Sequence, residues 1–362
     1  MLPTSTPPLL ILRVHTDLRL GLGHVARALI LQAQWRALGG TACLAVSGDA
    51  RARRMGDGLH PTLDQPLPCE AVDLGEDLHA GLPPEVQARG AIVLVDHWEA
   101  QVSELQALRP LKIALMEDET EAHEGADLLF QPFLEGVSWP GSPLRVVAGR
   151  KLRPLETVRG GCRVLRGSQF IVVDPLALRL RPLREPLQPL AAHKLLVTFG
   201  GTDGPGLARR ALAVLRDLVA TGRWTGSCTL LAPQGLTEPP FPGCRILPGL
   251  PGLTARLPEF DALWCAGGVT LAEANCLGLP AATWAQNDRQ HLMLAELAQH
   301  NGCLDLGVGA EADPATTAAA LAQWLGPEGQ ETRQEQVRDG RALVDGQGGQ
   351  RVIQALRELA QV

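Results

Sequence analysis

The first strand-length run of the chain passes through a glycine turn directly into a helix, and this succession restricts the fold more than any other feature. Leu9–Val14 is an apolar run, and Val25–Leu38 carries apolar residues at helical spacings of three and four. Between them stands Gly21-Leu-Gly-His-Val-Ala-Arg27. The order strand, turn, helix predicts an α/β unit whose glycine turn lies at the carboxyl end of the strand.

This turn is also a candidate site for chemistry. A helix N-terminus presents backbone N–H groups and the positive end of a dipole, so it attracts anions. His24 stands at the helix start, where an imidazole is favoured in the neutral form that a general base needs. The alternative is a tight strand–helix turn with a buried histidine.

Apolar runs and amphipathic stretches alternate along the rest of the chain, which is typical of α/β proteins. Further strands are predicted at 41–46, 91–95, 111–116 and 127–130, and then at 194–199, 228–232, 244–247, 261–265 and 280–284. Helices are predicted at 24–38, 101–108, 205–220, 270–277, 289–299, 313–325 and 349–360. Residues 137–188 are dense in Pro, Gly and Arg and predict a linker region, with a short strand at 170–173.

A chain of 362 residues is longer than one usual domain of about 100–200 residues. We therefore expect two doubly wound, Rossmann-like α/β domains that face a cleft. The expected division is an N-terminal domain at 1–160, a Pro/Arg-rich linker region at 161–190 and a C-terminal nucleotide-binding domain at 191–345. A final helix within 346–362 could cross back and pack on the first domain.

Composition excludes several classes of protein. A net charge of −6 argues against a nucleic-acid partner or an anionic membrane surface. The eight cysteines show neither CxxC nor Cys/His ligand spacing, so we expect no metal site and a reducing, cytoplasmic location. The N-terminus lacks the pattern of a secretory signal, and no apolar run reaches the ~18 residues of a membrane span. A monomer is favoured.

A second glycine turn, Phe199-Gly-Gly-Thr-Asp203, lies between a predicted strand and a predicted helix. Gly200 and Gly201 would let a ligand approach the backbone closely. Thr202 or Asp203 can cap the helix that follows. Ligand binding and an ordinary capped turn are equally compatible with this stretch alone.

The third glycine turn, within Cys265–Glu273, has the same setting. Gly267 and Gly268 stand where a diphosphate could lie over a helix N-terminus. Thr270 can cap that helix and donate its hydroxyl to a phosphate. Glu273 closes a capping box with Thr270 or binds ribose hydroxyls, and the local spacing slightly favours the capping box.

Polar side chains follow other strands at the edge where ligands bind in such sheets. Asp96 and His97 come directly after 91–95, and Asp96 is expected to face the cleft. Glu117, Asp118 and Glu119 follow 111–116, and two of these three are expected to belong to a solvated loop. Amides of the segment 286–290 could contact sugar hydroxyls, although a capped helix start at Asn287 or Asp288 explains the segment equally well.

In this order the motifs resemble those of the PseG family, the UDP-2,4-diacetamido-2,4,6-trideoxy-β-L-altropyranose hydrolases of pseudaminic acid biosynthesis, relatives of the MurG-like GT-B glycosyltransferases. The resemblance covers almost the whole chain. Its segments are Gly21–Arg27, which is similar to the family's GxGHxxR loop, Leu94–Trp98, Glu117–Glu119 with His123 and Asp127, Phe199–Asp203, Ala266–Glu273, Cys276–Pro280 and Gln290.

The resemblance implies a GT-B fold, no cofactor and a metal-independent hydrolysis of a UDP-sugar. His24 is implied as the base that activates water at the anomeric carbon, and Asp96 as the residue that orients the water or binds the sugar. The implied substrate-binding residues are Gly21, Gly23, Arg27, His97, Asp118 and Gln290. The implied nucleotide-binding residues are Gly200, Gly201, Thr202, Gly267, Gly268, Val269, Thr270 and Glu273.

The chain also departs from the family. Glu117-Asp118 replaces two aspartates, and Asp288-Arg289 before Gln290 is nearer to the MurG style. These departures leave the sugar unnamed. The alternatives are a GT-B glycosyltransferase with a UDP-sugar donor and a sugar-nucleotide-binding protein without catalysis.

Overall fold

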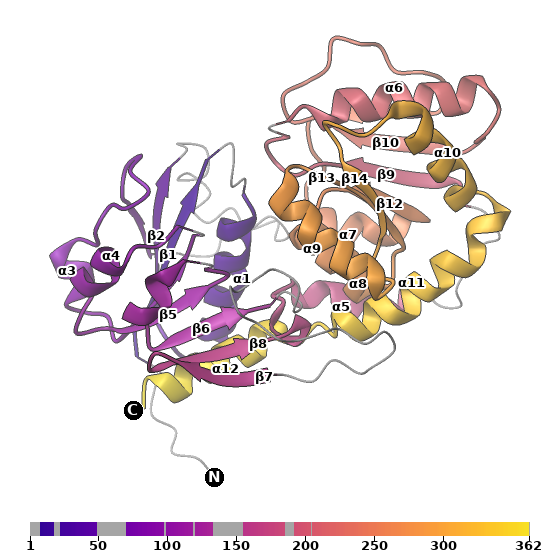
Figure 1. Cartoon of the computed structure of the whole chain (residues 1–362). Coiled ribbons are helices and arrows are strands. Elements are labelled where there is room, and N and C mark those ends of the chain that lie inside the picture. The colour runs from indigo at the N-terminus through magenta and orange to yellow at the C-terminus, as the bar shows by residue number, and fades with distance from the viewer. Residues whose placement is uncertain are drawn as a thin grey trace.

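A computed structural model describes residues 8–17, 22–48, 70–97, 99–118, 120–132, 155–184, 192–203 and 205–361. The chain forms two α/β domains, each built on a parallel sheet, and segments of the chain cross between them twice (Figure 1). This confirms the predicted fold class. Gly21, Trp98 and Glu119 lie outside the described residues.

The first sheet has the order β3-β2-β1-β4-β5-β6-β8-β7 and is parallel except for the β7–β8 pair. Its strands are β1 (Leu10–Thr16), β2 (Ala42–Gly48), β3 (Glu70–Asp73), β4 (Ile92–Asp96), β5 (Lys112–Met116), β6 (Leu128–Gln131), β7 (Leu155–Arg159) and β8 (Cys162–Arg166). The central strands β1 and β4 are buried along their whole length because both faces are covered, and they are mostly apolar, although β1 also contains the buried Arg13 and His15. Helix α1 (Gly23–Ala37) packs on one face. Helices α3 (Pro84–Gln87) and α4 (Val102–Ala107) lie on the other.

The second sheet has the order β11-β10-β9-β12-β13-β14 and is parallel throughout its described pairs. Its strands are β9 (Lys194–Thr198), β10 (Ser227–Leu231), β11 (Cys244–Leu247), β12 (Ala262–Cys265), β13 (Ala281–Ala285) and β14 (Leu304–Val308). The helices are α6 (Leu207–Ala220), α7 (Leu253–Arg256), α8 (Val269–Leu277), α9 (Asp288–Gln299), α10 (Pro314–Leu325) and α11 (Gln330–Leu343).

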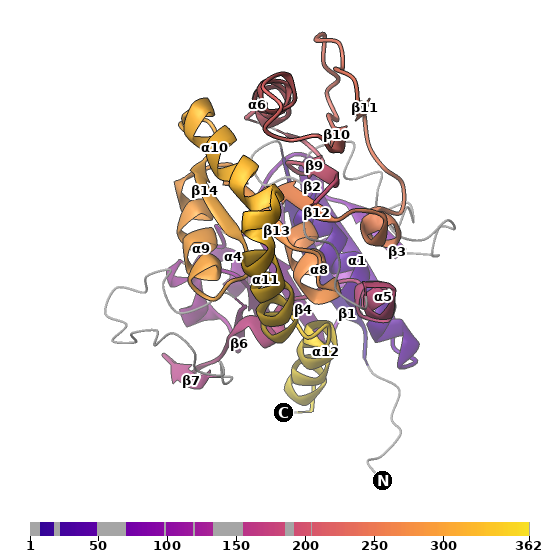
Figure 2. The same ribbon diagram turned by 90° about the vertical axis from the view of Figure 1, so that its right-hand side faces the viewer.

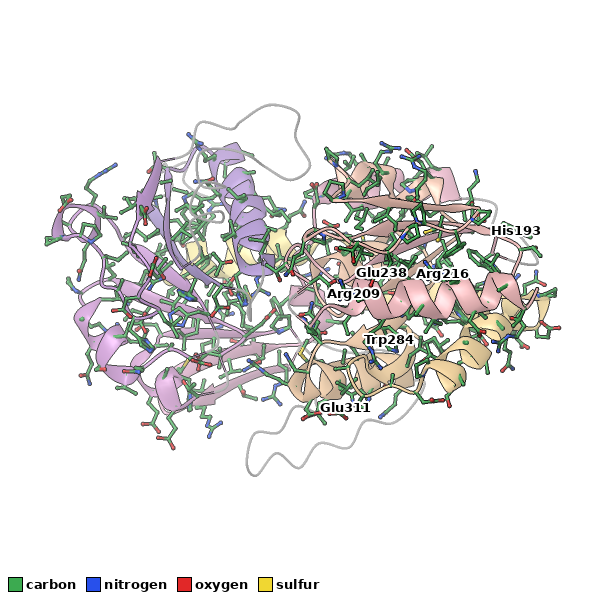
Figure 3. The ribbon with its side chains drawn as sticks, turned by 90° about the horizontal axis from the view of Figure 1, so that it is seen from above. His193, Arg209, Arg216, Glu238, Trp284 and Glu311 are labelled. Carbon is green, nitrogen blue, oxygen red and sulfur yellow. The ribbon has the colours of Figure 1, made fainter. Side chains whose placement is uncertain are left out.

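An aromatic trio fills the core between this sheet and the α6 layer. The rings of Trp264 and Trp284 lie 4.5 Å apart, and Phe199 lies within 6 Å of both. Figure 3 labels Trp284 within the domain and, on the α6 side, the surface ion pair between Arg209 and Glu238. The trio anchors the end of β9, from which the second glycine turn departs.

The two crossings differ from the linker that the sequence predicts. The hairpin of β7 and β8 belongs to the first sheet, so that sheet continues past residue 160 to Arg166. No strand forms at 170–173, where a 3₁₀ turn (Ser168–Phe170) leads into α5 (Pro175–Leu180).

The second crossing ends in α12 (Gly348–Leu359), which packs with α1 in the core of the first domain. Figures 1 and 2 show α11 and α12 running from the second domain to the first. Arg351 of α12 binds Asp345 and donates a hydrogen bond to the backbone carbonyl of Gln169 at 3.0 Å, which ties the two crossings together.

In both sheets the strand order reverses at a defined point, between β1 and β4 in the first and between β9 and β12 in the second. Ligands of doubly wound sheets bind at such switch points, beyond the carboxyl ends of the strands. All three glycine turns follow strands that flank these points. Among the described residues, no helix combines the length and the apolar character that a membrane span requires.

Candidate functional site

A cavity of about 340 Å³ is lined by both domains at the two switch points. Its volume lies in the range of small-molecule sites, roughly 300–1,000 Å³. From the first domain the lining includes Leu22, Gly23, His24, Arg27 and Glu117. From the second it includes Gly200, Gly201, Thr202, Thr254, Gly267, Gly268, Val269, Thr270, Glu273, Gln286, Arg289 and Gln290. Twelve of the residues implied by the resemblance therefore line one cavity: Gly23, His24, Arg27, Gly200, Gly201, Thr202, Gly267, Gly268, Val269, Thr270, Glu273 and Gln290.

The start of α1 meets both glycine turns of the second domain. The side chain of Leu22 packs on Gly201, where an added Cβ would come within 2.7 Å of Leu22 Cδ1. Gly23 lies opposite Val269 of the third turn, where a Cβ added at Gly23 would come within 4.0 Å of Val269 Cγ2. Glycine at 201 therefore permits the close approach of the two domains.

His24 and Arg27 stand three residues apart, on one face of α1, and both reach Asp96 at the end of β4. His24 Nδ1 lies 2.6 Å from Asp96 Oδ1. Because an ionised carboxylate only accepts hydrogen bonds, Nδ1 carries the proton. Arg27 holds the same carboxylate with two bonds, from Nε at 2.8 Å and from Nη2 at 2.6 Å. All three side chains are buried.

The charges within this group favour an ionised Asp96. Burial alone would raise the pKa of Asp96, but the Arg27 guanidinium and the His24 ring, through charge and hydrogen bonds, hold it well below its ordinary range. Burial also opposes the charge on Arg27, and Asp96 and Glu117 outweigh it, so the pKa of Arg27 is raised. The group is a histidine oriented by an ionised carboxylate, the arrangement that supports general-base catalysis.

Glu117, rather than Asp118, is the residue of the acidic strand end that enters the site. Glu117 lines the cavity and accepts a hydrogen bond from Arg27. Asp118 turns away: its carboxylate accepts the backbone N–H of Ala100 at 3.1 Å and both the N–H and the hydroxyl of Thr120. The expected substrate-binding role of Asp118 is therefore replaced by a role in holding the loop.

His97 also lies away from the cavity lining. Its Nε2 is 3.1 Å from Glu104 Oε1 on α4, and the ring is fully buried on the face of the sheet opposite α1. Successive side chains of a strand point to opposite faces, so His97 points away from the side on which Asp96 contacts His24 and Arg27. Among the described residues, Asp96 is not part of the cavity lining either, so the expectation that it faces the cleft is corrected: it reaches the site through His24 and Arg27. The expected role of His97 in substrate binding is not supported by this position.

The N-terminus of α8 points into the cavity without a side-chain cap. The helix begins at Val269, and neither Thr270 nor Glu273 forms the predicted capping box. Gly268 has φ of 144°, a conformation that L side chains rarely adopt, and an added Cβ there would meet open space. The first N–H groups of α8 are thus presented to a ligand, as at an anion site.

Glu273 is buried at the side of the cavity instead. Its Oε2 accepts the hydroxyl of Thr254 at 3.0 Å. Burial raises the pKa of Glu273 to about 8, the Thr254 hydroxyl opposes the rise, and the nearby Asp174 carboxylate adds to it. A buried carboxyl with a raised pKa lowers the stability of the unliganded fold at neutral pH, and such groups concentrate at functional sites.

The turn after β9 leads into a helix whose first N–H groups are capped by a side chain, unlike the turn after β12. Asp203 accepts the backbone N–H groups of Leu207 and Ala208 at 2.8 and 3.0 Å. The first turn of α6 is therefore already occupied by an anion from its own chain. Gly200, with φ of 90°, and Gly201 line the cavity as a close-packed wall.

Two amides hold the edge of the cavity in the second domain. Gln290 donates to the carbonyl of Gly267 at 2.6 Å and accepts the N–H of Gln286 at 2.8 Å. Gln286 in turn donates to the carbonyl of Phe199 at 2.6 Å. Asn287 caps α9, as the alternative interpretation of this segment predicted. Gln290 thus fixes the Gly267 turn in place as well as lining the cavity.

Sequence reasoning gave no role to Thr254, and it left Glu117, Gln286 and Arg289 without an assigned place in the site, although all four line the cavity. Three of them follow or flank strand ends in the sequence, which is a usable signal. Thr254 gave no signal, because only the tertiary fold places α7 beside Glu273.

Comparison with known proteins identifies the architecture. MurG of Acinetobacter baumannii superposes with a TM-score of 0.62 at 13% identity, covering 97% of this chain and all of MurG. The forosaminyltransferase SpnP superposes with a TM-score of 0.61 at 15% identity, covering 99% and 100%. The fold is GT-B. A UDP-GlcNAc 2-epimerase from Neisseria meningitidis, solved with UDP-GlcNAc bound, shares it with a TM-score of 0.59 at 10% identity, covering 97% and 100%.

In sequence, the GT-B chain is distantly related to the spore coat polysaccharide biosynthesis protein SpsG of Bacillus subtilis strain 168. The two are 24% identical over 218 residues, which span 58% of this chain and 62% of SpsG, less than two thirds of that relative. No protein-family model matches the chain.

Proposed function

We propose that this protein is a GT-B glycosyltransferase that uses a UDP-sugar donor in the biosynthesis of a polysaccharide. The observation that carries the proposal is the His24–Asp96–Arg27 group facing the uncapped N-terminus of α8 across one cavity. Support for the substrate class comes from the similar proteins: SpsG is a polysaccharide biosynthesis protein, SpnP is a forosaminyltransferase, and the epimerase structure holds bound UDP-GlcNAc.

In this proposal the second domain, which we take to comprise about residues 191–345, holds the nucleotide. The diphosphate would accept hydrogen bonds from the first N–H groups of α8, where Gly268 allows close approach. Glu273 would accept ribose hydroxyls. As the bond between the anomeric carbon and the phosphate oxygen breaks, the α8 dipole would stabilise the charge that develops on UDP.

The first domain would supply the base. Because Asp96 holds Nδ1–H of His24, the other ring nitrogen, Nε2, would take the proton from the acceptor hydroxyl. The acceptor oxygen then bonds to the anomeric carbon as UDP leaves, so one bond forms and one breaks. Positioned bases of this kind contribute about 10²–10⁴-fold to a rate.

A hydrolase is the second candidate, with water in place of the acceptor hydroxyl. The order of motifs from Gly21–Arg27 to Gln290, which resembles the PseG hydrolases, favours it. His24 and Asp96 would activate water in the same way. Release of a free amino or deoxy sugar for a nonulosonic acid of the pseudaminic type would then be the outcome.

The deciding experiment separates these reactions. The protein is incubated with a panel of UDP-sugars, first without and then with hydroxyl acceptors, and released UDP is measured. Release that requires an acceptor supports the transferase, and release in water alone supports the hydrolase. Binding of UDP without turnover under either condition would overturn both and leave a sugar-nucleotide-binding protein. Sedimentation and cell fractionation would test the expected monomeric state and cytoplasmic location.

A further inference from the structure

Glu117 is a charged residue of the cavity lining to which the proposed mechanism assigns no role. It follows β5 directly and has a left-handed backbone, with φ of 59°, which is uncommon for a residue other than glycine. Its N–H bonds to the carbonyl of Phe130 at 2.9 Å, so the neighbouring strand fixes this conformation. Such strain persists where the surrounding structure determines it, and it concentrates at functional sites.

This backbone conformation places two adjacent carboxylates in different surroundings. The carboxylate of Asp118 accepts hydrogen bonds from Ala100 and Thr120 of the neighbouring loops. Glu117 is turned into the cavity lining, where only 5% of the residue is exposed. Because Glu117 is not needed to hold the loop, its position requires a different explanation.

The carboxylate of Glu117 has capacity left for a ligand. Arg27 Nη1 donates to Oε1, and within the part of the chain that the structure describes no other side chain is recorded as a donor to this carboxylate. An ionised carboxylate has two oxygens and about four acceptor positions. Within the described residues, Glu117 therefore retains acceptor capacity for a ligand in the cavity that it lines.

The cavity is also polarised along the direction that a nucleotide sugar would span. At the second domain lie the positive end of α8 and the guanidinium of Arg289. At the first domain, Asp96 and Glu117 share the single positive charge of Arg27. The first-domain end thus prefers hydrogen-bond donors, and the second-domain end prefers an anion.

We propose, building on the function proposed above, that Glu117 is a specificity-determining residue that accepts a hydrogen bond from a hydroxyl or amide N–H of the donor sugar. The substrate class is a nucleoside-diphosphate sugar that carries such a donor near the reacting carbon. Arg27 holds the carboxylate in place, and the left-handed turn aims it. Removing either partner of a hydrogen bond to a charged group weakens binding about 10- to 100-fold.

The experiment is a binding cycle between Glu117 and the sugar. Dissociation constants are measured by calorimetry for UDP, UDP-glucose, UDP-GlcNAc and deoxyfluoro analogues of UDP-glucose. The proteins are the wild type, Glu117→Gln, Glu117→Ala and the control Glu124→Gln, which changes an exposed carboxylate of the same domain. Glu117→Gln keeps a carbonyl oxygen for Arg27 and replaces the other oxygen by a donor.

We expect all four proteins to bind UDP within about twofold of one another. Replacing one sugar hydroxyl by fluorine should weaken the binding of the sugar nucleotide by about 10- to 100-fold in the wild type and the control. The same replacement should change the affinity of Glu117→Ala little, because that variant has no carboxylate for the hydroxyl to bind. Equal losses for UDP and for every UDP-sugar, or a deoxygenation penalty that Glu117→Ala retains, would show that Glu117 only holds Arg27. Failure of the wild type to bind UDP at all would instead overturn the proposed function.

Discussion

The buried carboxyl of Glu273 leads to a quantitative prediction about stability. Its pKa in the fold is about 8, raised from an ordinary 4.5 mainly by burial. Below pH 4.5 the group is protonated in both the folded and the unfolded chain and costs nothing. Between pH 4.5 and 8 only the unfolded chain releases the proton, so each pH unit lowers the free energy of unfolding by about 1.4 kcal/mol. The cost is about 3 kcal/mol at pH 7 and about 5 kcal/mol above pH 8.

Glu273→Gln imitates the protonated group and keeps an oxygen for the Thr254 hydroxyl, so it removes this cost. We expect the variant to exceed the wild type by less than about 1 kcal/mol at pH 5 and by about 3 kcal/mol at pH 7. That difference corresponds to roughly 6–12 °C in melting temperature, taking about 2–4 °C per kcal/mol. The assay is urea and thermal unfolding of both proteins from pH 5 to pH 8.5.

The exposed Glu311→Gln, labelled in Figure 3, is the matched control and should leave the curve unchanged. Above pH 8, where the wild-type carboxyl is ionised, the same Glu273→Gln protein should bind UDP about tenfold more weakly, because an amide accepts ribose hydroxyls through one uncharged oxygen only. Stability curves of wild type and Glu273→Gln that run parallel across the whole pH range would refute the reasoning.

The remaining predictions concern the two ends of the cavity. His24→Gln should lower turnover by about 10²–10⁴-fold while calorimetry shows unchanged UDP affinity; near-normal turnover would remove His24 from the role of base. Asp96→Asn should lower turnover similarly by allowing the wrong imidazole tautomer, which steady-state kinetics would detect. Because the pKa of Asp96 is depressed, its stabilisation is present above the ordinary carboxyl range and is lost as pH falls through the folded value, so acid unfolding should shift to higher pH in Asp96→Asn. Gly268→Ala places a side chain at φ of 144° and should cost about 1–3 kcal/mol of stability and weaken UDP binding; an unchanged melting temperature would contradict this.

Most of the parallel sheets could be predicted because buried parallel strands are apolar along their length. The same argument explains what escaped prediction. Strand β7, with the sequence LETVR, lies at the sheet edge, and its residues 156–159 are all exposed, so it lacks an apolar run. Helix α11 is so polar that its few buried positions, such as Val337 and Leu343, give a weak periodic signal.

Site residues could be predicted where they follow directly from a strand end or a helix start. They could not be predicted where their position depends on packing between distant elements. The glycine turns, His24 and Asp96 could be recognised from their places at strand ends. The choice between Glu117 and Asp118 depends on one backbone torsion that the neighbouring strand fixes. The sequence could have predicted that His97 lies outside the cavity, because side chains alternate along a strand and His97 directly follows Asp96.

The packing of α12 on the first domain has a consequence for how the protein is made. Val352, Ile353 and Leu356 belong to the same hydrophobic core as β1 and α1, although more than 300 residues separate them in the sequence. A domain usually folds as a unit as it leaves the ribosome, N-terminal first. Here the first domain emerges early and lacks part of its core until residues 348–359 have been translated. The second domain, whose strands lie wholly within 194–308, has no such delay, so the half of the chain that is synthesised first is the half that is completed last.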